Sequence, residues 1–275
     1  MTKFASQENK EHWTNLANRF GKNLQATTKT STAKEIEVHA LLNCVIELQF
    51  NMDSNLKILE AGCGNGINLF KLHEKFPNFL LEGFDYVSRM IESAKSIQTE
   101  LQIPSSALKF SEASFEDYKM EIEYFDLIFT VRALINLPSF ENQRSAIEKL
   151  SCGIRKGGYL VMLENSQQSF ELQNSLRVKL GLPPRIQAEY NHFIDEDKLK
   201  KMIETTNLEL VKVQDFIGLH DLILYVLLPK LNENFIDYEN ELVSLATELL
   251  KKLSLNEMNL LGPFGQNRLF IYRKI

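Results

Sequence analysis

Cysteine is scarce in this chain, and its few residues follow no pattern that would cross-link a fold. The 275 residues include three cysteines, Cys44, Cys63 and Cys152, which is an odd number without a Cys-x-x-Cys pair. Neither a disulfide framework nor a thiolate zinc site is indicated. A reducing compartment fits this usage, and we expect a cytoplasmic protein.

Long hydrophobic runs are also missing. The longest apolar stretch, residues 222–229, is far shorter than the roughly 20 residues that span a bilayer. The polar residues 2–9 lack the apolar core of a secretion signal. We therefore expect no membrane partner.

An excess of positive charge is absent as well, since 31 Lys and Arg residues stand against 36 Asp and Glu residues, a net charge of −5. Proteins that hold phosphate backbones present basic surfaces, so nucleic acid is a poor expectation for the partner. The five histidines show no metal-ligand spacing such as His-x-x-x-His, so no metal is expected. A small molecule is the better candidate.

What the chain does contain is an apolar segment that breaks into three alternating glycines, Ile58-Leu59-Glu60-Ala61-Gly62-Cys63-Gly64-Asn65-Gly66. Glycine has no Cβ and tolerates left-handed turns, so the backbone here can approach a ligand closely. A dinucleotide fingerprint needs Gly-x-Gly-x-x-Gly, whereas the third glycine here comes one position early. Glu60 would repel a pyrophosphate but attract a ligand ammonium group. The pattern favours a cationic nucleoside cofactor over a nicotinamide or flavin dinucleotide.

Asp85 ends the next apolar segment, 19 residues beyond Gly66 (85 − 66). A carboxylate at this place can accept hydrogen bonds from both hydroxyls of a ribose. The two motifs together resemble the class I S-adenosylmethionine-dependent methyltransferases, in which acidic-x-Gly-x-Gly-x-Gly is followed by an acidic residue at the end of the second strand. The resemblance implies S-adenosylmethionine as the cofactor and a Rossmann-like fold.

The same resemblance assigns contacts to individual residues. Glu60 and the loop residues Ala61, Gly62, Gly64 and Gly66 would meet the methionine half of the cofactor. Asp85 would bind the ribose, and Tyr86 would lie against adenine, with ordinary packing as the alternative for Tyr86.

Strand-like and helix-like segments alternate from about residue 56 to 165. Strands are expected at 58–61, 79–84, 108–110, 125–130, 159–164 and 208–216, and helices at 34–50, 68–75, 88–100, 143–154 and 196–204. Ser88 is the expected N-cap of its helix, and Gly157-Gly158 the turn after the helix at 143–154. This order predicts an α/β fold, a doubly wound, mostly parallel sheet with helices on both faces. By resemblance the sheet has seven strands, and the last, 268–273, is antiparallel at the edge.

The chain divides into an N-terminal helical cap, 1–50, and a methyltransferase domain, 51–275, with insertions at 166–192 and 217–262. A tight connection takes roughly 2 to 5 residues, so the second insertion should cover something. We interpret both insertions as a substrate lid. A dimerisation surface is the alternative, and the protein is expected to be a monomer or a homodimer.

Further cofactor contacts follow from the resemblance alone. Ser114 stands where relatives carry an aspartate that binds the adenine amino group. Adenine binding would then depend on the Phe115 backbone amide, or Glu112 or Glu116 would supply the charge. Val131 belongs to the segment after the fourth strand that faces the cofactor. Lys29, in a hydroxyl-rich stretch before the first strand, could neutralise the cofactor carboxylate, unless this stretch is only a linker.

The candidates for binding the methyl acceptor and for catalysis come from the segment after the fourth strand, from the fifth strand and from the first insertion. Arg132 either clamps a substrate carboxylate or phosphate or pairs with Glu164 across neighbouring strand ends. Asn136 stands where many relatives carry a histidine, and Tyr190 is the other substrate contact. His192 is the candidate base, with a surface histidine as its alternative, and Glu164 is the second catalytic candidate.

Methyl transfer to a small acceptor, through an oxygen of a sugar or surface-polysaccharide precursor, is the expected function. N-methylation of another metabolite is an alternative. A cofactor-binding protein without catalysis is the hypothesis from another class, because the relatives' histidine and aspartate are missing at positions 136 and 114.

Overall fold

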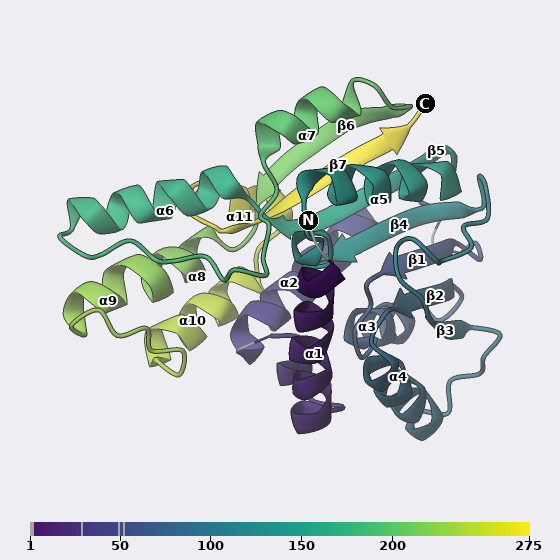
Figure 1. Ribbon diagram of the computed structural model, residues 1–275, viewed down its shortest axis with the longest axis horizontal. Coiled ribbons are helices and arrows are strands. Elements are labelled where there is room, and N and C mark those ends of the chain that lie inside the picture. The colour runs from purple at the N-terminus through teal and green to yellow at the C-terminus, as the bar shows by residue number, and fades with distance from the viewer. Residues whose placement is uncertain (1–2, 29, 49, 52) are drawn as a thin grey trace.

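The computed structural model describes residues 3–275 except 29, 49 and 52, and residues 3–8 by their backbone only. Its centre is one seven-stranded sheet with the strand order β3-β2-β1-β4-β5-β7-β6 (Figure 1). The strands are β1 (Lys57–Ala61), β2 (Leu80–Asp85), β3 (Leu108–Glu112), β4 (Phe125–Val131), β5 (Ile154–Asn165), β6 (Leu208–Asp215) and β7 (Asn267–Lys274). The doubly wound fold with an antiparallel last strand is confirmed.

The place of the last strand differs from the expectation. β7 pairs antiparallel with β5 on one side and with β6 on the other, so β6 forms the edge. The burial of the two strands explains this order. Nearly all of β7 is buried, whereas the middle of β6, including Leu210 and Val211, is exposed. The strand with the continuous apolar run therefore takes the interior position.

Helices cover both faces of the sheet. One face packs against α2 (Ser31–Glu47), α3 (Ile67–Lys75) and α4 (Ser88–Glu100), which contribute residues such as Leu41, Leu69 and Ile91 to a shared core. The other face packs against α5 (Phe140–Gly153) and α7 (Glu196–Ile203), through Ile147 and Met202 among others. β4 is buried along its whole length between these two layers.

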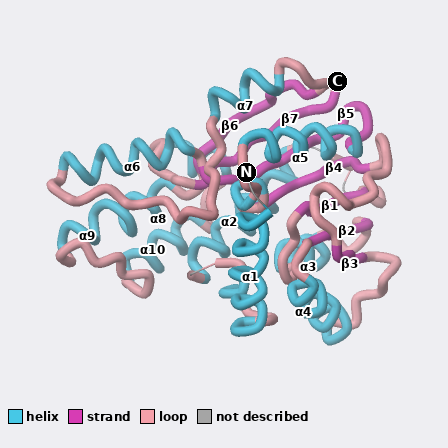
Figure 2. The backbone as a smooth tube through the Cα atoms, in the orientation of Figure 1, coloured by secondary structure: helices cyan, strands magenta, loops and turns pink. Residues whose placement is uncertain are grey.

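Most of the remaining helices extend beyond the carboxyl ends of the parallel strands, where Figure 2 shows a largely helical region beside the sheet. It is built from α6 (Gln167–Lys179), α8 (Gly218–Leu222), the π-helical turn η3 (Ile223–Leu227), α9 (Leu228–Leu231) and α10 (Glu241–Leu250). The last helix, α11 (Leu255–Leu260), packs against β6 and contributes Leu255 and Met258 to the core shared with α2. The N-terminal α1 (Lys3–Phe20) and the short η1 (Leu24–Ala26) lie against α4 through Ala17, Ala26 and Met90. No helix among the described residues is long and apolar enough to cross a membrane.

Some local boundaries differ from the sequence-based expectation. Val87, and not Ser88, is the N-cap of α4, and the Ser88 hydroxyl donates to Glu112 instead. Gly157 has φ of +79° and lies inside β5, because the helix ends at Gly153 and the strand begins at once, with an irregular register beside β4. The expected glycine turn is therefore a kink within the strand.

The packing of the core predicts that alanine substitutions at two phenylalanines, one buried and one exposed, change the stability of the protein by very different amounts. Phe129 is fully buried in β4. The substitution Phe129→Ala should lower the free energy of unfolding by about 3–5 kcal/mol, because it leaves a cavity in the core. Phe235, 67% exposed, is the matched control and should cost within about 0.5 kcal/mol. Urea unfolding followed by circular dichroism measures both, and equal midpoints would contradict this packing.

Candidate functional site

A glycine loop connects β1 to α3 and forms the floor of the site. Gly62, Gly64 and Gly66 all have left-handed backbone conformations, with φ of +76°, +53° and +80°. A Cβ at Gly62 would lie 2.5 Å from the Cβ of Ala133, and one at Gly64 would lie 2.7 Å from the Thr27 methyl. Both the turn and the close approach of neighbouring segments therefore require glycine here.

The Asp85 carboxylate fixes this loop to the end of β2. It accepts hydrogen bonds from the backbone N–H of Gly64 and of Val87, each at 2.9 Å. Burial raises the pKa of Asp85 to about 6, although these backbone donors act to lower it. Each oxygen retains a lone pair, so the carboxylate can also accept the hydroxyls of a bound ribose.

Glu60, at the end of β1, is the buried acid of the loop. One oxygen accepts from the Asn68 side-chain amide at 2.5 Å, and the other, Oε2, has no partner. Burial raises the pKa of Glu60 to about 8. An unpaired buried carboxylate oxygen is costly, and a ligand cation would compensate it. The acidic loop therefore fits the ammonium group of an amino-acid-like cofactor.

The residues expected around adenine lie at the same edge of the sheet. Tyr86 packs against the small cluster that joins α1 to α4. The Ser114 hydroxyl donates to Asp117 Oδ2 at 2.7 Å and accepts from the Asp117 N–H, which makes it part of a local turn. Phe115 packs edge-on against Phe84. The contacts of these residues with adenine stay predictions.

The N-terminal segment closes over the glycine loop. The Asn65 side chain donates to the carbonyls of Gly21 and Asn23 at 3.1 and 3.0 Å. The Asn9 side chain donates to the Asn136 carbonyl at 2.7 Å. The helical cap thus belongs to the site. Lys29, expected beside the cofactor carboxylate, lies outside the described residues.

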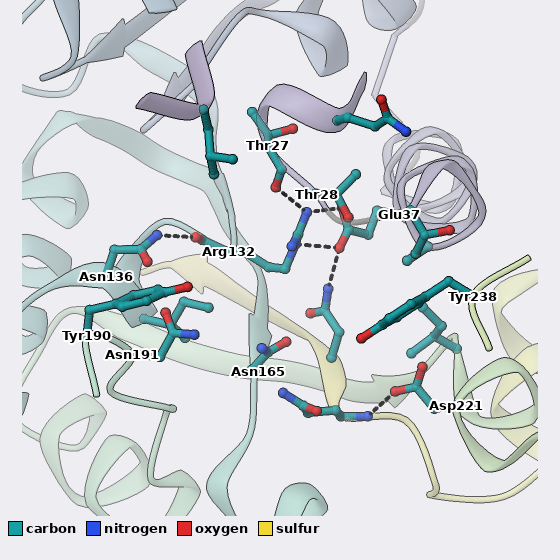
Figure 3. A pocket seen from close by; sticks show the side chains of 18 of the residues that line it. Thr27, Thr28, Glu37, Arg132, Asn136, Asn165, Tyr190, Asn191, Asp221 and Tyr238 are labelled. Atoms are coloured by element: carbon teal, nitrogen blue, oxygen red, sulfur yellow. Dashed lines mark hydrogen bonds and ion pairs between the residues drawn. The ribbon is translucent and has the colours of Figure 1, made fainter. Parts of the chain in front are cut away.

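A cavity of about 420 Å³ is bounded by the N-terminal segment, the ends of β4, β5 and β7, and the helical insertion. Thr27, in its wall, lies against Gly64, but Glu60, Asp85 and the glycine loop are not among the residues that line it. Its wall combines side-chain amides with aromatic rings: Asn136, Asn165, Asn191, Gln266, Asn267, Tyr190, Tyr225 and Tyr238. Figure 3 shows Asn136, Tyr190 and Asn191 on one side and Tyr238 and Asp221 on the other. The described residues contain no cluster suited to a metal ion.

Arg132 lines the cavity, but Glu164 is not its partner. Its guanidinium pairs with Glu37 of α2 at 2.6 Å and donates to the Thr27 carbonyl at 2.9 Å. Burial acts to raise the pKa of Glu37, but Arg132 and the buried Lys34 outweigh it and hold the pKa below its ordinary value. The expected pairing of Arg132 with Glu164 is therefore wrong, and the charge of Arg132 is already compensated.

Glu164 holds the loop after β4. Its two oxygens accept from the backbone N–H groups of Ala133, Leu134 and Ile135 at 3.0, 3.1 and 3.3 Å. The side chain is fully buried, and burial raises its pKa to about 7. Glu164 thus shapes the turn Leu134–Asn136, and it is not among the residues that line the cavity.

The residues expected to contact the acceptor line the cavity, whereas the candidate base does not. Tyr190 and Asn136 both line the cavity, and the Asn136 Oδ1 is buried without a partner. His192 lies on the same loop as Tyr190 but is not part of the lining. Its backbone ties this loop to the turn after β4, because the His192 N–H donates to the Ile135 carbonyl at 2.7 Å. The His192 carbonyl also accepts from the Gln143 side-chain amide at 2.6 Å.

Val131, expected to face the cofactor, is the last residue of β4. It is buried and belongs to the apolar core between the sheet and α2 to α4. A contact of Val131 with the cofactor stays a prediction.

Several cavity residues have no signal in the sequence. Glu37 sits on a helix whose other buried residues are mostly apolar, and its i−3 neighbour Lys34 is the only hint of a buried ion pair. Asp221, Tyr225 and Tyr238 come from the long insertion, whose path depends on tertiary packing.

The comparisons with known proteins agree with this geometry. Residues 52–207, more than half of the chain, match the family model described as "Methyltransferase domain". A malonyl-[acyl-carrier protein] O-methyltransferase from Ilyobacter polytropus is 30% identical over 149 residues, 54% of this chain and 52% of that protein. A ubiquinone biosynthesis O-methyltransferase from Rickettsia bellii is 24% identical over 182 residues, 64% of this chain and 72% of that protein. The match thus spans about half the length of the first relative.

Solved structures are similar in fold at low identity. The magnesium protoporphyrin IX methyltransferase of Synechocystis, solved with S-adenosylhomocysteine (SAH), has a TM-score of 0.56 at 12% identity, covering 87% of this chain and 83% of that one. A [4+2]-cyclase has a TM-score of 0.54 at 12% identity, covering 86% and 80%. At this identity the likeness concerns the fold alone, and the cyclase illustrates that one fold supports several reactions.

The Asp85 carboxylate yields the first binding prediction. Asp85→Ala should weaken SAH binding by about 1–3 kcal/mol, because hydrogen bonds to a charged acceptor are lost. Asp53→Ala, in an exposed turn, removes the same charge away from the site and should leave binding unchanged. Isothermal titration calorimetry measures both, and an unchanged dissociation constant for Asp85→Ala would show that the ribose lies elsewhere.

The raised pKa of Glu60 yields a pH prediction. Below its folded pKa of about 8 the free protein holds Glu60 protonated, and a cationic ligand favours the ionised form. SAH binding should therefore release protons and strengthen as pH rises toward about 8. Glu60→Gln should bind more weakly and lose most of this pH dependence.

The proton release is measured by calorimetry in buffers of different ionisation enthalpy. Asp85 interacts with Glu60, and burial raises its pKa to about 6, so the two proteins are compared near pH 8, where Asp85 is ionised. Equal proton release by wild type and Glu60→Gln would argue against a ligand cation at Glu60.

Proposed function

We propose that this chain, which belongs to the methyltransferase-domain family, transfers a methyl group from S-adenosylmethionine to an oxygen of a small molecule bound in the cavity. The observation that carries the proposal is the unpaired, buried Glu60 Oε2 at the end of β1, before a glycine loop whose Gly64 lies against Thr27 in the wall of a polar cavity. Glu60 and the glycine loop would form the cofactor site, and the cavity would hold the methyl acceptor.

The residues around the glycine loop are suited to the cofactor. Glu60 would hold its ammonium group, Asp85 its ribose, and Gly62 and Gly64 would allow the backbone to approach it closely. The cofactor supplies an already activated methyl group when bound. The protein's own task is to orient the acceptor and to exclude water.

The cavity fits a metabolite. Its volume of about 420 Å³ falls within the range typical of small-molecule sites, about 300–1,000 Å³. Amide side chains such as Asn165 and Gln266 can bind hydroxyl groups, and Tyr190 and Tyr238 present flat apolar faces. This combination supports a hydroxylated acceptor such as a sugar derivative.

The names of the two relatives support oxygen as the accepting atom, since both describe O-methyltransferases. Neither name mentions a sugar, so the sugar acceptor rests on the cavity lining alone. Asn136 and Tyr190 would position the acceptor. Of the two catalytic candidates, His192 is proposed as the base, because it shares the loop of Tyr190. The oxygens of Glu164 are occupied by backbone donors.

The insertions are proposed as a substrate lid. Asp221, Tyr225 and Tyr238 of the second insertion line the cavity, as does Arg185 of the first. A lid accounts for these side chains directly, whereas a dimerisation surface alone would not require them to face a cavity.

Turnover tests the proposal. The protein is incubated with S-adenosylmethionine and a panel of sugar nucleotides, phosphorylated sugars, small phenols and small carboxylic acids, and release of SAH is followed. At least one class should raise the release above the acceptor-free background. Asp85→Ala, weakened in cofactor binding, is the matched negative control and should lower that release at limiting cofactor.

Two other outcomes are informative. Binding of the cofactor without any release would favour a silent or non-methylating protein. Product analysis by mass spectrometry locates the methyl group, and a methylated nitrogen in place of oxygen would contradict the O-methylation part of the proposal.

A further inference from the structure

Arg185 is a cation of the cavity without a carboxylate partner. It lies on the loop after α6, lines the cavity and is partly buried. Among the described residues, no carboxylate lies within ion-pair distance of it. Its Nη1 donates to the Gln173 side chain at 2.8 Å, and its guanidinium lies over the ring of Tyr225, 3.6 Å from the centroid.

The neighbours of Arg185 hold it in one position. The Asn174 side chain accepts from the Arg185 N–H at 2.8 Å and donates to the Arg185 carbonyl at 3.1 Å. Tyr225 stands on the π-helical turn η3, a type of turn that is frequent at functional sites. A fixed guanidinium loses little conformational entropy on binding, so the site is preorganised.

A second guanidinium lies behind the first. Arg177, 2% exposed, donates from Nε to the Pro183 carbonyl at 2.9 Å and from its other nitrogens to Tyr225 and Asn234. All three acceptors are neutral. Burial and the nearby Arg185 lower the pKa of Arg177. Two cations therefore lie near this end of the cavity, and neither forms an ion pair with a carboxylate of the described chain. Asp221 reaches Arg185 only through the Gln173 side chain.

The other charges of the cavity are already paired. Arg132 is bound to Glu37 at 2.6 Å. Asp221 bonds to the His220 ring at 2.9 Å and accepts from the Gln266 N–H at 2.8 Å and from the Gln173 side-chain amide at 3.3 Å. Gln173 thus lies between the Asp221 carboxylate and the Arg185 guanidinium. The Tyr225 ring and the Gln173 side chain stabilise the Arg185 cation in part. A ligand anion would compensate its charge directly.

We propose that Arg185 binds an anionic group, a carboxylate or a phosphate, of the methyl acceptor. This inference rests on the proposed function and names the substrate class of the same cavity. The anionic group would lie beside Arg185 and Tyr225, in the same cavity as Asn136 and Tyr190. Arg132 cannot serve this role without first losing Glu37.

The geometry of the side chain suits either anion. A guanidinium has five N–H donors, and Gln173 takes one of them. The remaining donors can form the paired hydrogen bonds that recognise planar carboxylates and phosphates, which a lysine ammonium cannot reproduce.

Anion binding by two variants tests the inference. Inorganic pyrophosphate and malonate are titrated at constant ionic strength into the protein saturated with SAH. Wild type should bind at least one of them, Arg185→Gln should weaken that binding by about tenfold or more, and Arg185→Lys should recover only part of it. The better probe tells phosphate from carboxylate.

Arg144→Gln is the matched control, because Arg144 pairs with Glu148 on an exposed helix face away from the cavity. It should bind the probes like wild type. Thermal unfolding of each variant shows whether the fold is retained, and Arg185→Lys keeps the test valid if Arg185→Gln unfolds.

The failures are distinguishable. The anion site is refuted if SAH binds all proteins equally but neither anion binds wild type. It is also refuted if Arg185→Gln binds the anions as tightly as wild type. Neither result contradicts the proposed function. If SAH does not bind wild type, the proposed function itself fails.

Discussion

Buried carboxylates hold the loops at the carboxyl ends of the central strands, and the rest of the site depends on them. Asp85 binds backbone donors of the glycine loop and of the turn before α4. Glu164 binds three consecutive donors of the loop after β4. A buried acid is stable only when such donors satisfy it, so each acid fixes its loop. Glu60 is the exception, with one oxygen unpaired.

The unpaired oxygen of Glu60 indicates where a ligand can bind. An α/β sheet binds ligands at the carboxyl ends of its strands, where the strand order reverses. Here β1 lies between β2 and β4 at that point, and Glu60 stands near the end of β1. The N-terminal segment and the insertions then enclose the space above, so less water reaches the acceptor. The first insertion adds Arg185, a cation without a carboxylate partner among the described residues.

The fold and the cofactor were predictable from local sequence, whereas the individual contacts with the cofactor stay predictions. Alternating apolar runs, the three glycines and the two acids Glu60 and Asp85 are each read within a few neighbouring residues. The acceptor half was not. The pairing of Arg132 with Glu37 joins residues 95 positions apart (132 − 37), and the stacking of Arg185 on Tyr225 depends on how two insertions pack. The order of β6 and β7 also depends on burial along whole strands, which a short apolar segment does not reveal.

A crystal structure of the complex with SAH tests the central claim most directly. The account predicts the ligand ammonium group within hydrogen-bond distance of Glu60 Oε2 and the ribose hydroxyls on Asp85. An ammonium group bound elsewhere with Glu60 still unpaired, or a crevice that takes a pyridine dinucleotide instead, would contradict it.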